Sequence, residues 1–150
     1  MDLSTITAKV NAIDLAAAMD AAIKRENLPA ERAPAAVAAY RQFLTLAAAN
    51  PGKPVCVPSD ADKIWHQHML QSKQYRDDCK ALCGRHLDHD PTAFGTPEFN
   101  AAWAETVRLY KDTFGVDLDS DPASLDRTPL SAANCYKPAD DLPDDWPLRH

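Results

Sequence analysis

Prolines and a few glycines divide this 150-residue chain into helical segments. The twelve prolines cluster outside the stretches in which apolar residues recur at the spacing of a helix. A residue that precedes proline avoids helical backbone angles, so Pro29 and Pro51 end the segments before them. Gly84 stands where a long segment would end in the left-handed conformation. This pattern predicts an all-α fold.

The apolar periodicity predicts a compact domain of about four to five helices. Asp14 is placed to cap a break within the first segment, which therefore holds one or two helices. We expect the longest helix to be central, with the helices before and after it packed against it. The proline-bounded segment 53–58 is expected to be an extended connector. The expected helices span Thr5–Glu26 (one or two helices), Ala35–Ala49, Asp60–Cys83 and Pro97–Phe114.

Negative charge is concentrated at the C-terminal end of the chain. Residues 117–150 contain eight acidic and three basic residues, which leaves −5 of the total charge of −6 in this segment. We expect residues 1–116 to form the helical domain and 117–150 to be an irregular acidic tail, packed on the surface or partly disordered. Nucleic acids and anionic membranes both require a basic surface. The charge therefore excludes both and leaves an unknown protein or small molecule as the partner.

The sequence also predicts a cytoplasmic location. Its start lacks the basic residues and apolar core of a signal peptide, and no apolar run approaches the roughly 20 residues of a membrane span. Cytoplasmic thiols stay reduced. We therefore expect the four cysteines to be buried apolar residues or ligands and not disulfides.

Coordination and proton-transfer chemistry is concentrated in residues 60–91. This stretch contains four of the five histidines, at positions 66, 68, 86 and 89, and two of the four cysteines. On a regular helix His66 and His68 point about 160° apart, so they cannot bind one ion together. Three arrangements of these side chains remain, two with a metal and one without.

The first arrangement uses Asp62 and His66, which are four residues apart and adjacent on a helix. His89 from the following loop would complete a set of two histidines and one carboxylate. Such a set leaves open positions on the metal and suits iron, manganese or catalytic zinc. In the alternative without a metal, Asp62 only orients His66 or caps the helix.

The second arrangement is a closed structural zinc site made of Cys79, Cys83, His86 and His89. Its spacing matches no specific zinc pattern, and in the simpler alternative both cysteines are core residues at a helix end. In the third arrangement, His68 shares an apolar helix face with Tyr75 and is a buried histidine held by hydrogen bonds.

A longer pattern is spread over residues 36–115. Its parts are Ala39–Leu44, Val57–Ser59, Asp62, Trp65–Met69, Tyr75, Asp78–Cys79, Gly84, His89–Pro91, Trp103, Thr106, Leu109–Tyr110 and Phe114–Gly115. In order and spacing these residues resemble the glycine-rich domain-containing protein-like family, whose domain occurs in bacterial stand-alone proteins and at the start of larger plant proteins. The chain is similar to a bacterial stand-alone member, and the resemblance implies no defined biochemical activity.

The resemblance bears on the choice between the metal arrangements. The family pattern has large apolar residues at the positions of Cys83 and His86, which argues against the cluster of cysteines and histidines. The resemblance therefore favours, as metal ligands, Asp62, His66, His68 and His89. The glycine-rich segment that names the family is absent from this chain, which has four glycines.

Three functions are consistent with these features. The first is a small cytoplasmic binding domain whose histidine-rich site holds a divalent transition metal (zinc, iron or manganese). The second is a metal-dependent enzyme that uses the same residues in a hydrolytic or oxidative reaction. The third is a protein-interaction scaffold in which the histidines are buried structural groups.

Overall fold

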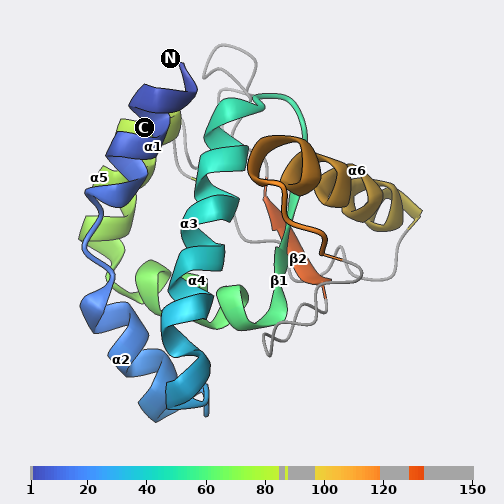
Figure 1. Cartoon of the computed structure of the whole chain (residues 1–150). Helices are drawn as coiled ribbons and strands as arrows, with labels where there is room; N and C mark the ends of the chain where they lie inside the picture. Colours follow the sequence, from blue (N-terminus) through green and yellow to red (C-terminus); the bar gives the residue numbers. More distant parts are fainter. Residues whose placement is uncertain (1, 85–86, 88–96, 119–128, 134–150) are drawn as a thin grey trace.

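The computed structural model describes residues 2–84, 87, 97–118 and 129–133 (Figure 1). Within these ranges the chain is mainly helical, which confirms the all-α fold. His86, His89 and most of the acidic tail lie outside the described residues. The elements in chain order are α1 (Leu3–Asn11), α2 (Ala16–Arg25), the 3-10 helix η1 (Ala30–Arg32), α3 (Ala33–Ala49), β1 (Val55–Pro58), α4 (Ser59–Leu70), α5 (Ser72–Cys83), α6 (Pro97–Phe114) and β2 (Pro129–Ala133).

The first predicted segment consists of two helices that separate near Asp14. The Asp14 Oδ1 accepts a hydrogen bond of 3.0 Å from the backbone N–H of Ala16, which confirms its role at the break. Asp2 caps α1 in a similar way and accepts a bond of 2.8 Å from the N–H of Thr5. Because the chain changes direction between α1 and α2, α1 packs on α3 and α5, whereas α2 packs on α3 and α4.

Helix α3 is the centre of the fold, in place of the longer segment that we expected there. It contacts α1, α2, α4, α6 and β1, and it runs through the middle of the molecule in Figure 1. A helix that is apolar around most of its circumference must be enclosed by other elements. The buried residues of α3 are Ala33, Ala36, Ala39, Tyr40, Phe43, Leu44, Thr45, Leu46 and Ala47.

The long central helix predicted from the sequence is wrong, because the chain forms two helices there, α4 and α5. They separate at Gln71, whose φ of −86° and ψ of 69° are not helical. On one straight helix, residues ten positions apart would be about 15 Å apart. Here Trp65 Nε1 donates to Tyr75 Oη at 2.9 Å, and His68 Nε2 lies 2.9 Å from Asp78 Oδ2. These contacts require α5 to fold back against α4.

Residues 55–58, expected to be a connector, form strand β1. It pairs with β2 in antiparallel register, with Cys56 opposite Ala132. All four residues of β1 are buried, and the pairing joins one part of the acidic tail to the helical domain. Neither strand shows the alternation of apolar and polar residues that marks a half-buried strand. This is why the sequence did not predict the pair.

Helix α6 has the predicted bounds, but its main contacts are with β1 and α3 and not with the expected central segment. Thr106 joins α6 to β1. Its Oγ1 accepts a hydrogen bond of 2.9 Å from the backbone N–H of Cys56 and donates one of 2.8 Å to the carbonyl of Ala102. None of the described helices is long and apolar enough to cross a membrane.

The described cysteines are in two different states. Cys56 and Cys79 are buried free thiols, as expected. Cys83 is disulfide-bonded, which corrects the expectation that the cysteines form no disulfides. A disulfide forms where the fold brings two Cα atoms within about 7 Å of each other. Spacing along the sequence does not reveal such an approach.

Replacing Tyr75 with phenylalanine should destabilise the domain by about 2–3 kcal/mol. The buried Tyr75 hydroxyl accepts from Trp65 and donates to the carbonyl of Leu87, and phenylalanine can do neither. Urea unfolding followed by circular dichroism measures the change. As a control, Arg76→Ala at the exposed neighbouring position should change stability by less than about 0.5 kcal/mol. Equal effects of the two substitutions would contradict a structural role for the hydroxyl.

Cys56 should resist alkylation in the folded protein. Its side chain is fully buried, and burial raises its pKa to about 11, so neither access nor thiolate is available at neutral pH. Peptide mass spectrometry should find Cys56 unmodified after iodoacetamide treatment, and modified when urea is added first. Rapid modification of the native protein would be inconsistent with the packing of α6 over β1.

Candidate functional site

His66 lies between two carboxylates that come from different helices. Its Nδ1 is 2.8 Å from Glu26 Oε1, and its Nε2 is 3.0 Å from Asp62 Oδ2. Asp62 precedes His66 by about one turn of α4, so the two side chains share a face. Glu26 caps the C-terminal end of α2 and reaches the site because α2 packs on α4. Gln67 donates to the second oxygen of Glu26 at 2.7 Å.

The two carboxylates control the charge of His66. The hydrogen bond with Asp62 is the largest effect and the bond with Glu26 adds to it, and together they raise the pKa of His66 to about 9 against the effect of burial. The protonated ring donates to both carboxylates. In the neutral ring one nitrogen presents a lone pair to a carboxylate. The site therefore favours a cation, either a proton or a metal ion, beside one of the two nitrogens.

His68 lies in the core, where 1% of its surface is exposed. Its Nδ1 is 2.7 Å from Tyr40 Oη in α3, and its Nε2 is 2.9 Å from Asp78 Oδ2 in α5. Burial lowers the pKa of His68 and raises the pKa of Tyr40 well above its usual value. We therefore assign a neutral ring that donates from Nε2 to Asp78 and accepts at Nδ1 from the Tyr40 hydroxyl. This is the buried, hydrogen-bonded histidine of the third arrangement.

The structure brings together two of the four expected metal ligands. Asp62 and His66 are adjacent, whereas His68 lies apart from them with both nitrogens engaged. His89 lies outside the described residues. Among the residues that the structure describes, no group of three or more histidine, cysteine, aspartate or glutamate side chains is arranged to hold a metal ion.

The described members of the alternative cysteine and histidine cluster are not available as a pair of thiolate ligands. Cys79 is a buried free thiol in the main core, packed with apolar residues. Cys83 is disulfide-bonded, so its sulfur carries no thiolate to offer to zinc. His86, like His89, lies outside the described residues. Among the described candidate ligands, Asp62 and His66 are therefore the pair that lies together.

Sequence reasoning missed three residues that hold these histidines, namely Glu26, Tyr40 and Asp78. Each comes from a different helix than the histidine it contacts, and Glu26 stands 40 positions before His66 in the chain. No local pattern marks such a partner. Tyr40 and Asp78 do belong to the long residue pattern on which the family resemblance was based, and that was the signal that could have identified them.

Comparison with known proteins shows which family the chain belongs to. The model of the UCP032817-like family matches residues 9–132. The chain belongs to this family. It is 36% identical over 87 residues to glycine-rich domain-containing protein 1 of Arabidopsis thaliana, and 33% identical over 87 residues to glycine-rich domain-containing protein 2 of the same plant. These matches confirm the resemblance to glycine-rich domain-containing proteins.

The matched regions are small parts of these relatives. Each match covers 53% of this chain and 11% of the relative, so the chain spans about a tenth of the length of the curated relatives it matches. No solved structure matches the chain. Family membership therefore establishes a shared domain and does not by itself give its function.

The stability of the domain should fall as the pH rises from about 6.5 to about 9. The pKa of His66 is near 6.5 in the unfolded chain and about 9 in the folded one. Its contribution to stability is therefore fully present below pH 6.5 and is lost as the pH rises through 9. In chelator-treated samples, the melting temperature of the wild-type protein should fall more over this range than that of His66→Gln. Parallel curves would contradict the raised pKa.

Proposed function

We propose that this domain binds a divalent transition metal through Asp62 and His66, with His89 as the third ligand. The observation that carries the proposal is the distance of 3.0 Å between His66 Nε2 and Asp62 Oδ2. Nitrogen and oxygen ligands lie about 2.0–2.2 Å from zinc, so two ligands that subtend 90–110° at the metal are about 3.0–3.4 Å apart. The pair has this spacing, and both side chains project from adjacent turns of one helix.

Glu26 supports this role because it orients the imidazole. Metal-binding histidines usually donate their second N–H to a carboxylate, which fixes the tautomer and the direction of the ring. His66 Nδ1 is 2.8 Å from Glu26 Oε1, so an Nδ1–H donor leaves the Nε2 lone pair on the side of Asp62. Gln67 holds Glu26 from the next position of α4. A metal ion would replace the proton shared by His66 and Asp62.

The proposed ligands indicate the kind of metal. Two imidazoles and one carboxylate suit zinc, iron(II) or manganese(II), and they leave coordination positions open. The side chain of His66 is 36% exposed, so an ion and a further ligand can reach it from solvent. His68 is not part of the proposed set, because Tyr40 and Asp78 hold both of its nitrogens.

The proposal is for a binding domain. In the plant relatives the matching region is 11% of a much longer chain. This proportion suits a binding module within a larger protein. The open positions of the metal would accept a small molecule or a side chain of a partner protein. A fold does not by itself imply a function, so the proposal rests on the side chains of the site.

Metal titration of chelator-stripped protein tests the proposal. We expect zinc, iron(II) or manganese(II) to bind at one ion per chain in calorimetry, with a matching content in elemental analysis. His66→Ala, Asp62→Asn and His89→Ala should each abolish stoichiometric binding, because each removes a ligand. Glu26→Ala should weaken binding about 10- to 100-fold through the lost orientation of the ring. Asp77→Asn, on the exposed face of α5, is the matched control and should bind normally.

Three results would contradict this assignment. Failure of the folded wild-type protein to bind any of the three metals would exclude the site. Binding that persists in both His66→Ala and Asp62→Asn would place the metal elsewhere. Persistence in His89→Ala alone would show that His89 is not the third ligand. Circular dichroism of each variant separates loss of the metal from loss of the fold.

A further inference from the structure

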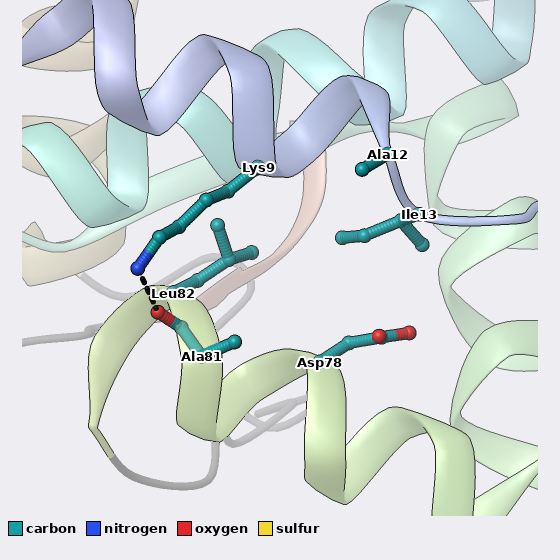
Figure 2. Close-up of a pocket in the computed structure, with 6 residues that line it drawn as sticks. All are labelled: Lys9, Ala12, Ile13, Asp78, Ala81 and Leu82. Carbon is teal, nitrogen blue, oxygen red and sulfur yellow. Dashed lines mark hydrogen bonds between the residues drawn. The ribbon is translucent and has the colours of Figure 1, made fainter.

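A small pocket lies between α1 and α5 and includes neither Asp62 nor His66 (Figure 2). Its volume is about 250 Å³. Drug-sized ligands occupy pockets of roughly 300–1,000 Å³, so this one suits a smaller molecule. Its lining residues are Lys9, Ala12, Ile13, Asp78, Ala81 and Leu82.

The pocket carries one positive and one negative group, and they are held apart. Lys9 Nζ donates to the carbonyl of Ala81 at 3.3 Å, whereas Asp78 Oδ2 accepts from His68 Nε2 at 2.9 Å. Figure 2 shows Lys9 and Asp78 at opposite ends of the pocket. Asp78 and Ala81 are three positions apart, about 4.5 Å along the axis of α5. The Lys9 ammonium is bonded to the Ala81 carbonyl and the Asp78 carboxylate to His68, so each charge has its own partner in the fold.

The remaining lining of the pocket is apolar. Ile13 follows the C-terminal end of α1 and Leu82 lies in α5, and their side chains point into the space between the two helices in Figure 2. Ala12 and Ala81 add only methyl groups, which leave this space open. A ligand that fits must therefore have an apolar body between two opposite charges.

Both sides of the pocket are held in place by the core. Asp78 is fixed through His68, which is 1% exposed and bonded in turn to Tyr40. On the other side, Arg41 donates to the carbonyl of Ile13 at 3.0 Å and holds the end of α1. A carboxylate that is already fixed costs little to organise when a ligand binds. The fold thus sets the negative end and the apolar wall of the pocket, and the exposed Lys9 side chain supplies the positive end.

We propose that this pocket binds a small ω-amino acid, with its ammonium group at Asp78, its carboxylate at Lys9 and its methylene chain against Ile13 and Leu82. An α-amino acid carries both charges on one carbon and could match only one end of the pocket. The proposal does not depend on the metal site, because the pocket shares no residue with Asp62 and His66.

Nuclear magnetic resonance titration of the full chain with δ-aminovalerate tests the proposal. We expect saturable shifts of backbone amides in α1 and α5. Pentylamine and valerate, which carry one charge each, should bind at least about fivefold more weakly. Lys9→Met and Asp78→Asn should weaken binding by a similar factor, while Lys24→Met, at an exposed lysine of α2, should not. Asparagine at position 78 can still accept from His68, so the core contact is kept.

Four results would contradict the binding of a free ω-amino acid in this pocket. No saturable shift at millimolar δ-aminovalerate in the folded wild-type protein would overturn the proposal. So would equal affinity for pentylamine, or unchanged affinity in Lys9→Met, whose exposed position leaves the core intact. Tighter binding of Nα-acetyl-lysine would overturn the assignment to a free small molecule, in favour of the carboxy-terminal lysine of a protein.

Discussion

The domain depends on a buried polar network that ties three helices together. His68 in α4 joins Tyr40 in α3 to Asp78 in α5. Trp65 in α4 is bonded to Tyr75 in α5, across the break between these two helices. Polar groups buried this deeply cost free energy unless each finds a partner. A continuous helix would keep these partners apart. The network therefore specifies how α5 folds back, which apolar packing alone leaves less defined.

Helix α4, which carries Trp65 and His68, also carries the proposed metal ligands Asp62 and His66 on another face. Arg32 anchors the beginning of α4, with bonds of 2.9 and 3.1 Å to the two oxygens of the fully buried Asp60. His68 anchors its last turn in the core. Asp62 and His66 lie between these two anchors, so their spacing does not depend on a loop. A site on a helix that is held at both ends is preorganised, which is what metal binding requires.

The pocket proposed to bind an ω-amino acid uses a different part of the same network. Asp78 accepts a hydrogen bond from His68 in the core, and its carboxylate also lines the pocket. The residue that positions α5 is therefore also the negative end of the pocket. The proposed metal site depends on the packing of α2 against α4, and the pocket depends on that of α1 against α5. The two proposed binding roles therefore use different packing contacts of one domain.

Local sequence determined most of the helical boundaries. Asp14 accepts from the first N–H of α2, Gly84 takes the left-handed φ of 71° after α5, and the bounds of α6 agree with those predicted. These features depend on residues within one or two helical turns, where spacing and capping act directly. Only the tertiary structure decided the break between α4 and α5, the pairing of β1 with β2, and the partners of the histidines. Glu26 and Tyr40 reach His66 and His68 across 40 and 28 positions of the chain. Such contacts follow from how helices pack, which no local pattern encodes.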